Sequence, residues 1–151
     1  MSAAADNNSD ELIGRTGEPF GFPVELGKVR EFARAIASRE PAFAQGAVTP
    51  PTFLMAAEHW QARANSPWGE HRPNLARLLH AEQEFVFHGA PPAAGANLRG
   101  QARIDKRYVK EGKRGGTMTF TELVTEYHDE GGGLVAEVRT TLVETSKAAK
   151  Q

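Results

Sequence analysis

Apolar residues repeat at helical spacing near the start of the chain. They recur every three or four positions: Leu26, Val29, Phe32, Ala33, Ile36 and Ala37. This spacing predicts an amphipathic helix over about residues 26–38, which Pro41 is expected to end. A short strand interrupted after Phe22, where Pro23 follows, is expected to precede it.

A second helix is predicted after the Thr-Pro-Pro-Thr segment 49–52. Proline suits the first turn of a helix, and Thr52 is a suitable N-cap. Large and small apolar side chains then cover most of the helix surface: Phe53, Leu54, Met55, Ala56, Ala57 and Trp60. A helix that is apolar nearly all round is buried in its domain, so His59 on this helix is expected to be a packed core histidine.

The second half of the chain alternates between apolar and polar residues as β-strands do. Four such runs cover residues 83–88, 98–108, 117–127 and 134–142, with glycine or proline clusters between them. In the second run one parity holds the apolar and small residues: Leu98, Gly100, Ala102, Ile104 and Tyr108. The opposite parity holds the charged ones: Arg99, Arg103, Asp105 and Arg107. A strand, two helices and four antiparallel strands predict an α+β domain.

Composition narrows the class of protein. A chain of 151 residues is the usual size of one domain, and we expect a body over residues 12–145 between polar tails at 1–11 and 146–151. The hydrophobic fraction is 40%, but much of it is alanine, so the core is thin for this length. With a net charge of −1, a thin core favours association with a second subunit.

Several classes are excluded. Without cysteine there is no disulfide or zinc–thiolate site, and no His-Glu-x-x-His spacing occurs; we expect no metal and no cofactor. No apolar run reaches the length of a membrane span, and the first residues do not read as a signal peptide, so we expect a cytoplasmic protein that does not bind membranes. A pI near 6.5 argues against nucleic-acid binding.

Charge is segregated along the strands. Basic residues dominate 99–114 and acidic residues dominate 117–145. The favoured interpretation is that the two segments are neighbouring antiparallel strands with opposite charges across the ladder. The alternative is that Lys106, Arg107 and Lys110 also contact an anionic ligand, such as a coenzyme A phosphate or an acidic carrier protein.

Five short motifs, in order, resemble one known family. They are Ile13-Gly14, Val29-Arg30-Glu31-Phe32-Ala33, Pro50-Pro51-Thr52-Phe53, Leu79-His80-Ala81-Glu82-Gln83-Glu84-Phe85 with His88, and Gly115-Gly116-Thr117-Met118-Thr119-Phe120. Over residues 13–145 the chain resembles the N-terminal-type domain of MaoC-like dehydratases. The resemblance implies a hot-dog fold, an antiparallel sheet wrapped around a central apolar helix, working as a dimer. That family includes R-specific enoyl-CoA hydratases, (3R)-hydroxyacyl-ACP dehydratases and non-catalytic subunits of heterodimeric dehydratases.

The resemblance breaks at the catalytic dyad. In catalytic members an Asp, and a His five residues later, activate one water for addition to an enoyl double bond. With Pro41 as the anchor, these positions hold Ser38 and Phe43, and neither is a general base near neutral pH. The sequence therefore predicts an acyl-CoA- or acyl-ACP-binding subunit, in a homodimer or paired with a catalytic hot-dog subunit.

Two other functions remain open. His80 and Glu82 share one strand parity and would lie about 7 Å apart, close enough to flank a water in an independent homodimeric hydratase. The plainer interpretation is a solvated polar face. The third function is a non-enzymatic acyl-thioester-binding module.

The start of the second helix is the predicted ligand-facing segment. Amides at a helix N-terminus stabilise a thioester oxyanion. The expected substrate-binding residues are Thr49, Pro50, Thr52, Phe53, Met55 and Trp60, although simple core packing explains the aromatic residues almost as well. The stretch 112–116 is expected to be a hairpin turn.

Overall fold

The computed structural model describes residues 10–71, 73–113 and 116–146. Most of the predicted tails, together with Arg114 and Gly115, lies outside the described residues. Asp10 and Glu11, assigned to the tail from sequence, instead belong to a 3₁₀-turn, η1 (Asp10–Leu12), which ends in the buried Leu12.

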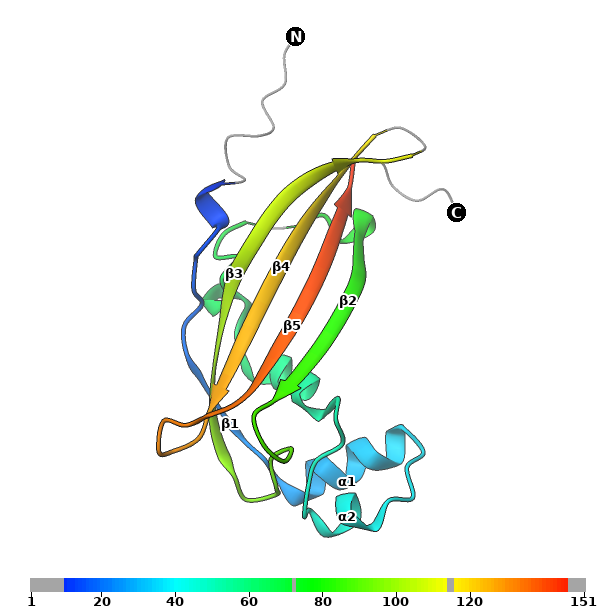
Figure 1. Cartoon of the computed structure of the whole chain (residues 1–151), viewed down its shortest axis with the longest axis vertical. Helices are drawn as coiled ribbons and strands as arrows, with labels where there is room; N and C mark the ends of the chain where they lie inside the picture. Colours follow the sequence, from blue (N-terminus) through cyan, green and yellow to red (C-terminus); the bar gives the residue numbers. More distant parts are fainter. Residues whose placement is uncertain (1–9, 72, 114–115, 147–151) are drawn as a thin grey trace.

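Five antiparallel strands form one sheet in the order β1-β3-β4-β5-β2 (Figure 1). The strands are β1 (Phe20–Pro23), β2 (Leu78–Phe87), β3 (Asn97–Glu111), β4 (Thr117–His128) and β5 (Leu134–Thr145). The four predicted strands of the second half are present, and β2 begins well before residue 83. The α+β prediction is confirmed.

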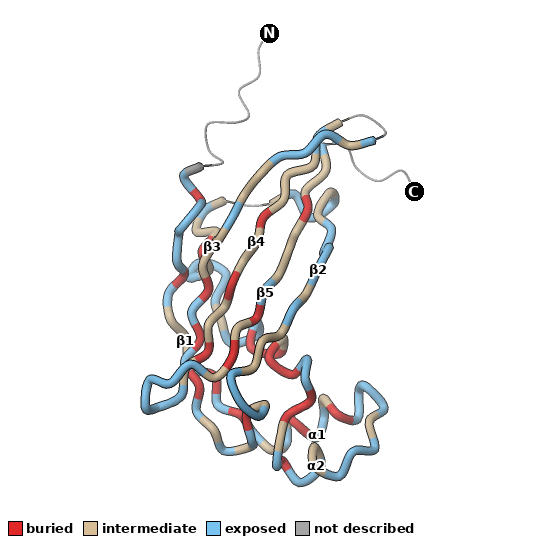
Figure 2. The backbone as a smooth tube through the Cα atoms, in the orientation of Figure 1, coloured by how far each residue is buried: buried red, intermediate tan, exposed pale blue. Residues whose placement is uncertain are grey.

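The core lies on one face of the sheet, here called the inner face, which carries Leu98, Tyr127, Ala136 and Val138. Against it pack α1 (Leu26–Ala35) and the 3₁₀-helix η2 (Phe53–Trp60). Figure 2 shows buried segments along β3, β4 and β5 as well as near the helices. The opposite, outer face has no such cover from α1 or η2.

The first helix is shorter than predicted. It ends at Ala35, and Ala37 takes a left-handed backbone conformation with φ of 55°. Pro41 does not close this helix but starts a second short one, α2 (Pro41–Gln45), where its fixed φ suits the first turn. Helix α2 was missed because five residues show no period.

The apolar second helix is a 3₁₀-helix, and Thr52 makes no side-chain cap, contrary to the prediction. Phe53, Leu54, Ala56 and Ala57 are buried. His59 is exposed, so its prediction as a core histidine was wrong: the buried residues of η2 all lie within its first five positions.

A β-bulge in β3 corrects the predicted faces of that strand. The register shifts between Ile104 and Lys106, so Asp105 is an extra residue. Beyond a bulge every side chain changes face. Tyr108 therefore lies on the outer face and Arg107 on the inner one, the reverse of the sequence prediction.

No helix in the described parts of the chain combines the length and apolar character needed to cross a membrane.

Replacement of Phe53 by alanine is expected to lower the free energy of unfolding by about 3–5 kcal/mol. Phe53 is fully buried and its ring contacts those of Phe22 and Phe32, with centroids 5.8 and 5.5 Å away. Urea denaturation measures the change. The control Leu75→Ala, at a side chain 72% exposed, should stay within about 0.5 kcal/mol; equal losses would contradict the core assignment.

Candidate functional site

Thr49, in the segment before η2, has a buried side-chain hydroxyl with no hydrogen-bond partner among the described residues. The Thr49 backbone N–H donates to the Pro92 carbonyl at 2.9 Å. Its side chain is 1% exposed, and Oγ1 makes no hydrogen bond within the described residues. Buried hydroxyls are nearly always satisfied, so an unpartnered oxygen at this depth is unusual.

A buried tyrosine ties η2 to the sheet. The Tyr127 hydroxyl of β4 donates to the Leu54 carbonyl at 3.5 Å. Burial, and secondarily the Glu58 carboxylate, raises the pKa of Tyr127 far above its ordinary range. Tyr127 therefore stays protonated and acts as an anchor, not as a base.

The six predicted substrate-binding residues divide by accessibility. Thr49, Pro50 and Phe53 are enclosed, whereas Thr52 is exposed and Met55 is half-buried. Of these five residues, therefore, only Thr52 and Met55 reach the surface.

Trp60 closes the far end of η2 and is 36% exposed. Its ring meets Phe22 edge-on at 5.4 Å, and the Lys28 ammonium lies 5.9 Å from it. Half-buried Phe85 and Phe87 of β2 pack against the same core as η2. Trp60 thus lies beside β1, whereas Phe85 and Phe87 give the inner face at the β2 edge its apolar character.

Ser38 and Phe43, the residues expected at the family's dyad positions, have local structural roles. Ser38, between α1 and α2, accepts a hydrogen bond from the Glu40 backbone N–H through Oγ at 3.2 Å. Glu40, the nearest carboxylate, caps α2 by accepting from the Ala42 N–H at 3.2 Å. Phe43 is a half-buried residue of α2. The segment thus presents a capped turn and no acid–base pair.

The structure separates His80 from Glu82. The β2 register shifts between them, so Ala81 is a bulge residue and the two side chains lie on opposite faces. His80 Nε2 lies 3.0 Å from Gln83 Oε1 on the inner face. The sequence prediction of a shared face was wrong, because a one-residue bulge is invisible to alternation.

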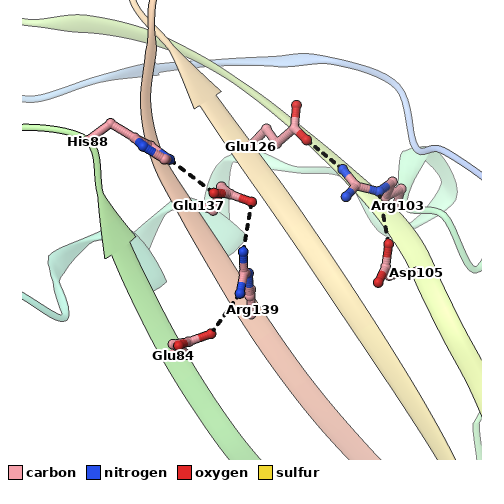
Figure 3. A network of polar contacts seen from close by, with 7 residues as sticks. All are labelled: Glu84, His88, Arg103, Asp105, Glu126, Glu137 and Arg139. Atoms are coloured by element: carbon pink, nitrogen blue, oxygen red, sulfur yellow. Dashed lines mark hydrogen bonds and ion pairs between the residues drawn. The ribbon is translucent and has the colours of Figure 1, made fainter.

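A polar network covers the outer face instead (Figure 3). Glu137 lies between His88 and Arg139, at 3.0 and 3.3 Å, and Arg139 also contacts Glu84 at 3.2 Å. The hydrogen bond from His88, and further that from Arg139, holds the pKa of Glu137 below its ordinary value of 4.5. Alternation in 134–142 signals this set, since Glu137 and Arg139 are out of phase with the buried residues of β5.

The segregated charges meet as the favoured interpretation predicted. Arg103 of β3 contacts Glu126 of β4 at 2.6 Å, and Lys106 contacts Glu122 at 3.2 Å. These paired charges border a hollow of about 360 Å³ on the outer face. Its charged lining does not suit an apolar chain.

The proposed anion contacts fall on two faces. Lys110 on the outer face lies over the stacked rings of Tyr108 and Phe120, 5.1 and 5.2 Å from their centroids, and Lys106 is paired with Glu122. Arg107 alone lies on the inner face, where its buried Nε has no hydrogen-bond partner within the described residues.

Within the described ranges, no group of three His, Asp or Glu side chains is placed to hold a metal ion.

The model of the family described as FAS1-like, dehydratase domain region, matches residues 11–138. The chain belongs to this family, as a MaoC-like dehydratase domain. No curated protein sequence matches it significantly.

The dehydratase domain shares the hot-dog fold of several solved structures. A chain of the HadBC (3R-hydroxyacyl-ACP dehydratase) complex from Mycobacterium tuberculosis is 28% identical, with 87% of this chain and 96% of that chain covered and a TM-score of 0.65. The ChsH1–ChsH2 complex from the same organism matches at 18% identity over 89% and 86%, with a TM-score of 0.70. R-hydratase PhaJ1 from Pseudomonas aeruginosa matches at 12% over 92% and 88%, with a TM-score of 0.59.

Glu137→Gln is expected to lower the free energy of unfolding at pH 7 by about 1 kcal/mol. A carboxylate whose folded pKa is depressed stabilises the fold above its unfolded pKa, and this stabilisation is lost as the pH falls through the folded value. Urea denaturation should therefore show wild type and variant converging as the pH falls below the ordinary carboxyl pKa of 4.5. Glu111→Gln, at an exposed carboxylate, should differ little from wild type at either pH; a Glu137→Gln deficit independent of pH would contradict the ionic role.

Proposed function

We propose that this dehydratase domain binds an acyl-CoA or acyl-ACP thioester and completes a two-subunit hydratase or dehydratase. A partner hot-dog subunit supplies the Asp and His that handle the water. The single observation that carries the proposal is the hot-dog frame with Ser38 and Phe43 at the dyad positions. No Asp or His occurs between residues 24 and 58 to replace them.

The geometry near η2 supports the binding half of the proposal. The thioester carbonyl lies at the start of η2, near the unpartnered Thr49 hydroxyl and the exposed Thr52. The acyl chain lies along Met55 and the half-buried aromatic side chains of β2. Helix N-terminal dipoles and enclosed donors stabilise developing negative charge on such a carbonyl oxygen.

Two similar structures are complexes, which supports the part of the proposal that pairs this chain with a catalytic subunit. The solved HadBC and ChsH1–ChsH2 structures are each complexes of two named subunits. An independent hydratase using His80 and Glu82 is disfavoured, because the bulge at Ala81 places these groups on opposite faces. A thioester-binding module without a catalytic partner remains an outcome of the test.

The purified chain alone should show no hydration of crotonyl-CoA, measured as loss of enoyl absorbance. Activity should appear when the chain is co-purified with a hot-dog protein that carries an intact Asp/His pair. The matched control is the same complex with that partner's Asp replaced by Asn. Robust turnover by the isolated chain would sink the proposal, and binding of crotonyl-CoA without any catalytic partner would favour the binding module.

Arg107→Glu should weaken binding of crotonyl-CoA to the complex by about tenfold or more, because a charge-assisted hydrogen bond contributes about 1.5 kcal/mol. Arg107 lies on the same face as η2, whereas Lys106 and Lys110 lie on the other. Calorimetric titration at low and high salt tests this. The double variant Lys106→Glu/Lys110→Glu is the control and should bind as wild type; the opposite ranking would place the phosphate contact on the outer face.

A further inference from the structure

The inner face of β2 changes from apolar to polar along the strand. Phe85 and Phe87 are half-buried and pack against the core. Gln83 and His80 come next on the same face, and the His80 side chain is exposed. His80 therefore lies next along the strand to the aromatic side chains beside which the proposed acyl chain runs.

Hydrogen bonds fix the orientation of the Gln83 side-chain amide. Its Nε2 donates to the Arg139 backbone carbonyl at 2.9 Å, and because a carbonyl oxygen only accepts, the NH₂ group must be the part that faces it. The amide oxygen Oε1 points the other way and accepts from the Thr140 hydroxyl at 2.9 Å. Gln83 thus presents to His80 an atom that can only accept a hydrogen bond.

This oxygen determines which nitrogen of His80 carries the hydrogen. His80 Nε2 lies 3.0 Å from Gln83 Oε1, so Nε2 is the donor. In the neutral ring Nδ1 is then an acceptor, and it makes no hydrogen bond or ion pair among the described residues. Active sites orient a histidine in the same way, through a group bound to its other nitrogen.

The charged groups on this face do not provide a partner for Nδ1. Arg107 of β3 lies in the same row of cross-strand partners as His80, and a guanidinium is a donor that is always charged. Glu144 of β5 lies two residues beyond the cross-strand partner of His80 and is held by Arg77 at 3.0 Å. The lone pair of Nδ1 is therefore available to a neutral hydrogen-bond donor from outside the chain.

We propose that His80 Nδ1 accepts a hydrogen bond from the bound acyl thioester, and that Gln83 is the positioning residue that fixes the His80 tautomer. Two parts of such a ligand carry neutral donors: a hydroxyl on the acyl chain, and the amide N–H groups of the pantetheine arm. The proposal rests on the proposed function, because it concerns the same ligand. It adds a contact by which this chain distinguishes thioesters with a donor from those without one.

The tautomer can be measured without a ligand. Long-range proton–nitrogen correlation spectra of isotopically labelled protein should show His80 with its hydrogen on Nε2 and a bare Nδ1. Gln83→Leu should produce a mixture of both tautomers, because no acceptor then selects one. The control His128→Phe, on the outer face, should leave the His80 signals unchanged. A wild-type His80 that carries its hydrogen on Nδ1 would overturn the proposal.

Matched ligands separate the two sources of the donor. Calorimetric titration uses the complex whose partner Asp is replaced by Asn, so that no ligand reacts. His80→Phe should weaken binding of 3-hydroxybutyryl-CoA about fivefold, the value of one hydrogen bond. If the hydroxyl is the donor, crotonyl-CoA should bind as before. If an amide is the donor, crotonyl-CoA should lose as much, and the ethyl thioester of crotonic acid, which has no pantetheine, should lose nothing.

Two further measurements separate a contact from a structural role. His80→Asn keeps an acceptor close to the position of Nδ1 and should restore most of the affinity, whereas His128→Phe should bind as wild type. Acidification until the spectra show Nδ1 protonated should remove the difference between wild type and His80→Phe, because the lone pair is then occupied. Crotonyl-CoA and 3-hydroxybutyryl-CoA that bind normally to His80→Phe would overturn this inference and leave the proposed function standing. If no thioester bound to the wild-type complex, both would fail together.

Discussion

Burial of the first part of η2 against the sheet is the contact on which the rest of the structure depends. Phe53 packs between Phe22 of β1 and Phe32 of α1, and the Tyr127 hydroxyl of β4 donates to the η2 backbone at Leu54. This packing covers the inner face and fixes where η2 begins. It thereby creates the enclosed environment in which the Thr49 hydroxyl lacks a protein partner.

The bulges in β3 and β2 determine which side chains of these strands lie on each face of the sheet. The extra residue Asp105 turns Arg107 toward the η2 side and leaves Lys106 and Lys110 outside. The extra residue Ala81 separates His80 from Glu82. The inner face holds the apolar core residues and Arg107, and the outer face holds the ion-paired charges of β2, β3, β4 and β5.

The periodicity of apolar residues predicted the helices and strands well, but it predicted only in part which side chains lie on each face of the sheet. The α+β order, the four long strands and the pairing of basic with acidic strands follow from alternation and charge, because many residues contribute to each signal. Single-residue features do not. Nothing local marks Asp105 or Ala81 as extra, and an apolar run of eight residues does not tell a 3₁₀-helix from an α-helix. The predicted helix cap at Thr52 and the buried His59 failed for the same reason. The binding role of the segment before η2 stays a prediction, and alternation could not show that Thr49, Pro50 and Phe53 are buried while Thr52 is exposed.

The strand order has a consequence for how the chain folds. β2 precedes β3 and β4 in sequence, yet it completes its ladder on β5, and β1 lies at the far edge beside β3. The local hairpins β3–β4 and β4–β5 are able to form early, but both outer strands depend on pairings across long stretches of chain. Such non-local contacts slow folding and prolong the exposure of apolar strands. During synthesis the aromatic side chains of β2 stay exposed until β5 has been made. Charged residues in the same strand, Glu82 and Glu84, oppose aggregation during that interval.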